Sequence, residues 1–199
     1  MASDSEERIQ ELCRQGQTHE GLALAVEAYG AEVYGFIVSR LRDESAAGDV
    51  FAQTCEDLCT SIGDFGWRCS LRTWTYRLAR SAISRYLRNP ANVSGRRLPL
   101  SQVSEIADRI RTQTREYLRT EVKDQFAELC RELEPDDQML LTLRVDRELE
   151  WAEVAQVLSD EELTGEDLAQ ASARLRQRFK TVKDHLRDRA VAIGLISNM

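Results

Sequence analysis

Apolar residues recur along most of this 199-residue chain at the three- and four-residue spacings of amphipathic α-helices. The clearest stripe lies in residues 19–42 and consists of Leu22, Val26, Tyr29, Val33, Ile37 and Leu41. Further stripes and their flanking breakers predict helices over residues 5–16, 45–62, 70–88, 102–133, 135–145, 149–158 and 164–190. Only three prolines and few β-branched runs occur, so the chain is predicted to be all-α.

Residues 89–101 hold two of the three prolines and lack strong periodicity, which indicates a linker. We therefore expect two small helical domains, residues 1–90 and residues 122–199, joined by a linker over residues 91–121. Near the start of the last helix, Thr164 and Asp167 have the spacing of a capping box with aspartate in place of glutamate.

Charge divides the chain into four blocks under an overall net charge of -7. Residues 1–64 carry 13 acids and 4 bases, whereas residues 65–104 carry 8 arginines and no acid. Residues 105–170 carry 19 acids and 8 bases, and residues 171–189 carry 7 bases and 2 acids. Two basic blocks in an acidic chain are typical of a protein that contacts a polyanion at two places and repels it elsewhere.

The first basic block forms one face of the helix predicted over residues 70–88. At about 100° per residue, the side opposite the apolar stripe carries Arg77, Arg80, Ser81, Ser84, Arg85 and Arg88. Trp74 falls on this basic side, near Ser81 and Arg85. Two interpretations of Trp74 remain open at this point: a core residue, or an aromatic ring that stacks on a base of a single strand.

The second basic block surrounds a narrow apolar seam formed by Leu175, Phe179, Val182 and Leu186. The rest of that helix is covered by Arg174, Arg176, Gln177, Arg178, Lys180, Thr181 and His185. Such a helix can dock on a small domain and still enter a major groove. The amphipathic segment 149–158 precedes it, which suggests a helix-turn-helix, although the connection is longer than in a simple motif.

Catalytic, metal and membrane functions have little support in the sequence. The five cysteines, Cys13, Cys55, Cys59, Cys69 and Cys130, lack tight zinc-ligand spacing and are expected to be reduced thiols. There is no phosphate-binding glycine loop or nucleophile elbow, so we expect no enzyme, cofactor or metal. No run of 18 apolar residues and no secretory signal is visible, which predicts a cytoplasmic protein without a membrane segment.

Several segments of the chain resemble the sequence signatures of one protein family. Residues 65–80, FGWRCSLRTWTYRLAR, resemble the signature F-R-G-E-S-S-L-R-T-W-L-Y-R-I-A-R. Residues 49–54, DVFAQT, resemble D-L-V-Q-E-T, and residues 133–144 resemble L-P-P-x-x-R-x-x-L-x-L-R. Residues 148–158, ELEWAEVAQVL, resemble G-L-S-Y-E-E-I-A-E-I-L, and residues 175–180 take the place of V-K-S-R-L-H. These are signatures of the extracytoplasmic-function (ECF) sigma factors of bacterial RNA polymerase, and the chain most resembles those of myxobacteria.

The resemblance implies a sigma-2 domain, a linker and a sigma-4 helix-turn-helix domain in the order given above. It assigns contact with the β′ clamp helices of core RNA polymerase to Asp49, Val50, Gln53 and Thr54. It assigns recognition and melting of the promoter -10 element to Arg68, Arg72, Trp74, Arg77, Arg80, Ser81, Ser84, Arg85 and Arg88. It assigns recognition of the promoter -35 element as duplex to Arg174, Arg176, Gln177, Arg178, Lys180, Thr181 and Lys183. The polymerase β flap and an anti-sigma factor are the further partners expected.

The sequence departs from the family pattern at three places. Ala52-Gln53 replaces a Gln-Glu pair, the loop 67–69 is more basic and aromatic than usual, and residues 159–170 are an insertion between the two sigma-4 helices. Two other functions stay open beside the sigma factor. One is a DNA-binding regulator with a degenerate sigma-2 interaction module, and the other is a helical adaptor that binds only protein.

Overall fold

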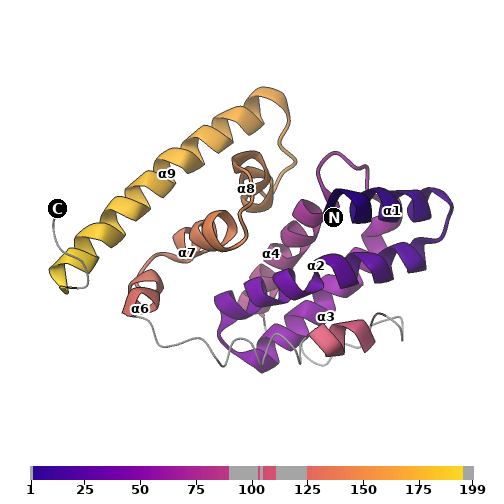
Figure 1. Ribbon diagram of the computed structural model, residues 1–199, viewed down its shortest axis with the longest axis horizontal. Coiled ribbons are helices and arrows are strands. Elements are labelled where there is room, and N and C mark those ends of the chain that lie inside the picture. The colour runs from indigo at the N-terminus through magenta and orange to yellow at the C-terminus, as the bar shows by residue number, and fades with distance from the viewer. Residues whose placement is uncertain (1, 90–102, 104, 111–124, 195–199) are drawn as a thin grey trace. The chain divides into compact units, whose positions relative to one another are not determined.

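A computed structural model describes residues 2–89, 103, 105–110 and 125–194, which form helices, turns and loops and contain no β-strand. The chain divides into two compact units, residues 1–120 (unit 1) and residues 121–199 (unit 2). The all-α fold class predicted from the sequence is confirmed (Figure 1).

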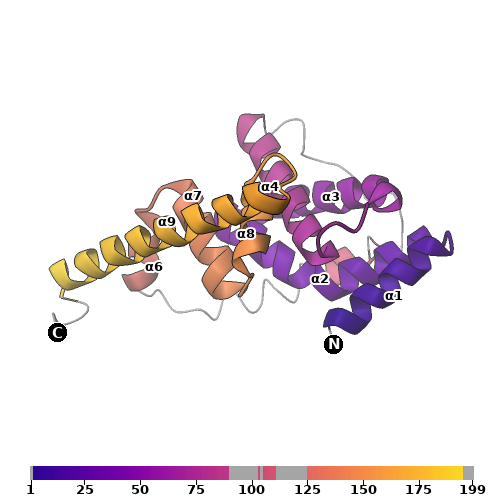
Figure 2. The ribbon, with the colours of Figure 1, turned by 90° about the horizontal axis from the view of Figure 1, so that it is seen from above.

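Unit 1 is a helical bundle around a densely packed aromatic centre. Its helices are α1 (Ala2–Arg14), α2 (Thr18–Leu41), α3 (Glu44–Ser61) and α4 (Leu71–Arg88), and the short 3-10 turn η1 (Ile62–Asp64) follows α3. Figures 1 and 2 show α1 lying along α2, and α2 packs on both α3 and α4. The largest fully buried side chains of this core are Tyr34, Tyr76, Phe36, Phe51, Ile9, Leu22, Ile37, Leu58, Ile62, Leu71 and Ile83.

Local capping residues determine where α3 and α4 begin. Arg42 ends α2 in the left-handed conformation with φ 55°, and the side chain of Asp43 then accepts from the backbone N–H groups of Ser45 and Ala46. The hydroxyl of Ser70 accepts from the N–H of Thr73, 3.1 Å away, at the start of α4. Each such cap contributes about 1 kcal/mol to helix stability. The α3–α4 pair is therefore fixed at both helix starts.

A helical stretch from the predicted linker also packs on unit 1. Residues 103 and 105–110 are helical, with Val103, Ala107 and Ile110 buried. A Cβ on Gly30 would lie 2.5 Å from Cδ1 of Ile110, so a larger residue there would require the Ile110 side chain to shift. The predicted linker 91–121 thus includes a packed helix, and the rest of that range lies outside the described residues. The single helix predicted over 102–133 likewise falls partly outside them.

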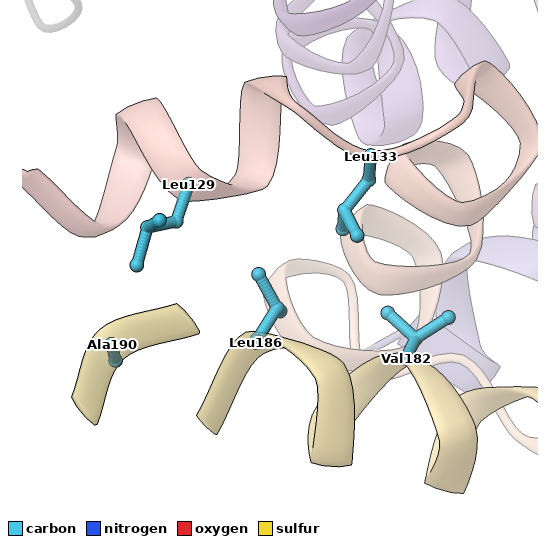
Figure 3. Packing of buried hydrophobic residues seen from close by; sticks show 5 residues of the cluster. All are labelled: Leu129, Leu133, Val182, Leu186 and Ala190. Atoms are coloured by element: carbon cyan, nitrogen blue, oxygen red, sulfur yellow. The ribbon is translucent and has the colours of Figure 1, made fainter. Parts of the chain in front are cut away.

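Unit 2 is built along one long helix, α9 (Gly165–Ala192). The shorter helices α6 (Gln125–Arg131), α7 (Pro135–Leu141) and α8 (Trp151–Leu158) each contact α9. A cluster of buried aliphatic side chains joins α6 and the turn that follows it to α9, and Figure 3 shows them facing each other: Leu129, Leu133, Val182, Leu186 and Ala190.

In unit 2, the predicted helical segment 135–145 is helical throughout but changes its type of helix, and one predicted helix cap is wrong. The predicted helix 135–145 ends as an α-helix at Leu141 and widens into the π-helical turn η3 (Thr142–Asp146), where the N–H of Arg147 bonds to the carbonyl of Thr142 at 3.0 Å. The predicted capping box at Thr164 does not form, because its side chain makes no capping hydrogen bond, although α9 does start directly after it.

Among the described residues, α2 is long and apolar enough to cross a membrane by length and composition. Its apolar window is 67% buried within unit 1, and a buried apolar helix is also what the core of a helical bundle requires. We therefore assign α2 to the bundle core, where Leu22, Val33 and Ile37 are almost fully buried.

Candidate nucleic-acid interface

An aromatic cluster lies at the start of α4, where the loop after η1 returns to the bundle. The rings of Phe65 and Trp74 stack with centroids 5.4 Å apart and planes 24° apart, and Trp67 packs on Phe65 at 4.9 Å. The guanidinium of Arg77 lies over the Trp74 ring, 5.3 Å from its centroid. Trp74 is therefore partly buried against Phe65, and its ring also faces a cation.

The indole nitrogen of Trp74 is buried and has no hydrogen-bond partner among the described residues. A buried N–H without a partner is costly. Trp67 adds a second unfavourable feature, since it adopts φ 54°, a left-handed conformation that is rare for a bulky residue. Both residues belong to the aromatic cluster, Trp67 in the loop before α4 and Trp74 in the first turn of α4. Strain of this kind tends to gather at functional sites.

Two arginines of the predicted DNA face are held by acids from other helices. Arg72 forms a bidentate ion pair with Glu32 of α2, with both N–O distances at 2.7 Å. Arg85 pairs with Asp57 of α3 and donates to the hydroxyl of Ser81 at 3.0 Å. Sequence analysis missed both pairs, because the acids lie 40 and 28 residues away along the chain.

The other predicted residues of this face are at least partly accessible. Arg68, Ser81, Ser84 and Arg88 are exposed, while Arg77 and Arg80 are half-buried. Arg88 donates through Nε to the carbonyl of Ser84 at 3.3 Å, one turn back along α4. The α4 face thus keeps accessible cations around the aromatic cluster, and no acidic residue occurs in the sequence from 65 to 104.

The residues predicted to contact polymerase on α3 are mostly buried. Val50, Thr54 and Gln53 expose 0%, 1% and 5% of their surface, so only Asp49 of the predicted set is partly accessible. The physical reason is the run of small residues Ala46, Ala47, Gly48 and Ala52, which lets neighbouring segments approach α3 around much of its circumference. The sequence pattern had placed only a single apolar stripe there.

In unit 2, the predicted duplex-contacting residues all lie exposed along the middle of α9: Arg174, Arg176, Gln177, Arg178, Lys180, Thr181 and Lys183. Arg178 forms an ion pair with another helix, since its Nε lies 2.5 Å from Oδ1 of Asp137 in α7. This hydrogen bond is the main reason that the pKa of Arg178 is raised further above its ordinary value.

A second aromatic–cation cluster lies between α8 and α9. Trp151 and Phe179 meet edge to face with centroids 5.4 Å apart. The guanidinium groups of Arg144 and Arg176 lie 5.1 and 6.0 Å from the Trp151 centroid, and the amine of Lys183 lies 5.2 Å from that of Phe179. Sequence analysis did not include Arg144 or Trp151 in the site, although both fall within the segments that resemble the family pattern.

The inserted residues 159–170 are partly absorbed into a longer α9. Gln156 is buried, its amide donates to the carbonyl of Leu163, and the N–H of Leu163 lies 3.4 Å from its Oε1. These two contacts close the loop between α8 and α9, and residues 165–170 form the first turns of α9. Because those turns carry Glu166 and Asp167, the basic residues start only in the third turn.

The described residues define a helical protein with two separate basic surfaces, each arranged around a tryptophan. Residues 25–92 match the family model of Sigma-70 region 2. This segment contains most of α2, all of α3 and α4, and the aromatic cluster, and the match supports a sigma-70 family sigma factor. No curated protein and no solved structure gives a significant match to the chain.

Proposed function

We propose that this protein is a promoter-specificity subunit of the ECF sigma type, which binds core RNA polymerase and directs it to start transcription. The observation that carries the proposal is the aromatic cluster at the start of α4, where Trp74 lies against Phe65 and Arg77 inside the segment that matches Sigma-70 region 2. Sigma factors of this family are regulatory subunits without enzymatic activity, and they act in the cytoplasm.

Strand opening at the -10 element is the role proposed for unit 1. A base leaving the duplex needs a ring to stack on and cations to hold its backbone, and such stacking is worth about 1–3 kcal/mol per base. Trp74 offers the ring when Arg77 moves from it toward a phosphate. Arg80 and Arg88 of α4 and Arg68 of the preceding loop are at least partly accessible for backbone contact, with Ser81 and Ser84 as exposed hydroxyls on α4.

Recognition of the -35 element as duplex is the role proposed for unit 2. Arg174, Arg176, Gln177 and Lys180 are exposed on one long helix, and arginine and glutamine are the side chains that pair with guanine and adenine edges in a major groove. The acidic first turns of α9 would repel phosphates, which favours entry of the middle of the helix into the groove.

Polymerase contact is proposed for the accessible acids of unit 1 rather than for its buried α3 residues. Asp49 is half-buried and is the accessible member of the predicted set, and the 13 acids of residues 1–64 give this part of the chain a negative surface for basic polymerase segments. The β′ clamp helices, the β flap and an anti-sigma factor remain the proposed protein partners.

The proposed role of Trp74 in strand opening is tested by measuring how far core polymerase opens promoter DNA in the presence of this protein. With wild-type protein, thymines near the start site should become reactive to permanganate. Trp74→Ala should still bind core polymerase but lose most of this reactivity, because the stacking surface is gone. Trp74→Phe keeps a ring in place and should retain part of it. Unchanged permanganate footprints with Trp74→Ala would show that the ring plays no part in melting.

A further inference from the structure

A chain of polar contacts connects α3 to the basic face of α4. The amide nitrogen of Gln53 donates to Oδ1 of Asp57 at 2.8 Å and to Glu56 at 3.2 Å. The other carboxylate oxygen of Asp57 pairs with Nη2 of Arg85. Nη1 of Arg85 in turn donates to the hydroxyl of Ser81 at 3.0 Å. Asp57 thus holds a cation of the proposed DNA face from a neighbouring helix.

The position of Asp57 gives it an electrostatic role that no residue of α4 can supply. Residues 65–104 contain no acid, so every counter-ion for the α4 arginines must come from elsewhere in the protein. The side chains of Asp57 and Arg85 are 22% and 38% exposed, which leaves the guanidinium within reach of an approaching phosphate. A phosphate and Asp57 therefore compete for the same group, because both are anions that bind guanidinium through charge-assisted hydrogen bonds.

We infer that Asp57 is a positioning residue that acts as the internal counter-ion of Arg85 and restrains the affinity of the α4 face for DNA. Gln53, which was expected to contact polymerase, instead supports this carboxylate from within α3. The inference rests on the proposed DNA-binding function. Its consequence is that unit 1 binds stray single strands more weakly than its eight arginines between residues 65 and 104 would allow.

The test compares full-length wild-type protein with Asp57→Asn, which removes the charge and keeps the size of the side chain. Binding to a fluorescein-labelled single-stranded oligonucleotide of mixed sequence is measured by anisotropy over a series of salt concentrations. We expect affinity at low salt to rise about two- to fivefold, the range that corresponds to losing one partly exposed ion pair. The slope of log affinity against log salt should steepen by about 0.7, since one more phosphate contact forms.

Two matched variants separate this effect from a general change in charge. Glu20→Gln removes one exposed acid of α2 and should leave the salt slope unchanged. In an Arg85→Ala background, Asp57→Asn should no longer raise the affinity, because the released cation is absent. Asp57→Glu keeps the charge and should behave like wild type. Thermal unfolding followed by circular dichroism shows whether each variant is folded.

Different results would overturn the counter-ion role of Asp57 and the proposed function. If wild-type protein binds neither the oligonucleotide nor core polymerase, the proposed function is wrong. If wild-type protein binds DNA but Asp57→Asn leaves the affinity unchanged or lowers it, the counter-ion role is wrong. The role is equally overturned if the gain from Asp57→Asn persists without Arg85.

Discussion

The two helices that carry the basic surfaces rest on very different supports. In α4, 7 of 18 residues are buried, and Tyr76 at its centre packs edge-on against Phe36 in a core of large aromatic side chains. In α9, 4 of 28 residues are buried, and the helix packs against α8 and, through the aliphatic cluster around Val182 and Leu186, against α6. The basic surface of α4 is therefore part of a packed bundle, whereas α9 is exposed around most of its circumference.

Under the proposed function, the packing of each helix suits one kind of nucleic acid. A single strand is flexible, so a surface that captures it gains from rings and cations already fixed by a dense core. A duplex offers a wide major groove, and a helix can enter it only if it stands clear of its own domain. The aromatic cluster at the start of α4 fits the first requirement, and the long exposed α9 fits the second.

The comparison predicts that unit 2 is the easier unit to unfold. Leu186→Ala should destabilise unit 2 by about 2–4 kcal/mol, because the small cluster offers few neighbours that could close the cavity. Hydrogen exchange should show lost protection in residues 125–194 and unchanged protection in residues 18–88. Val145→Ala, at a side chain that is 55% exposed, serves as the control and should change little. Equal loss of protection in both units would show that they unfold together.

The α9 surface itself should not be uniform. Arg176→Ala should weaken binding to a duplex carrying the upstream promoter motif by about 1–3 kcal/mol. Arg178→Ala should cost less, because Arg178 must first leave Asp137 before it can reach a base. Fluorescence anisotropy on the same duplex measures both variants. An Arg178→Ala loss as large as that of Arg176→Ala would contradict the view that Asp137 holds this guanidinium back.

A smaller effect is expected at the turn before α8. Glu148 adopts φ 53°, and the family pattern that it resembles has glycine at this position. Glu148→Gly should stabilise unit 2 by about 0.5–1 kcal/mol, because relief of the left-handed strain exceeds the entropy cost of glycine. Glu148→Ala keeps a Cβ and should give no such gain. Denaturant unfolding measures both, and equal stability of the two variants would mean that the turn is not strained.

The sequence predicted the helices of unit 1 well and their contacts poorly. The starts of α3 and α4 follow from Asp43 and Ser70, which are local signals. The helices α2, α3 and α4 lie within one residue of their predicted bounds, whereas α1 starts three residues earlier and ends two residues earlier than predicted. The ion pairs of Arg72, Arg85 and Arg178 join residues 28 to 41 positions apart, and helical periodicity does not reveal such pairs. Helical periodicity also did not indicate that Val50 and Thr54 would be buried among small residues.

Transcription by core RNA polymerase from fragmented genomic DNA, with and without this protein, tests whether the protein directs the polymerase to promoters. We expect discrete RNA 5′ ends that appear only when the protein is present and that share two upstream sequence motifs, one for each basic surface. Binding of the protein to core polymerase without any new 5′ ends would contradict this expectation.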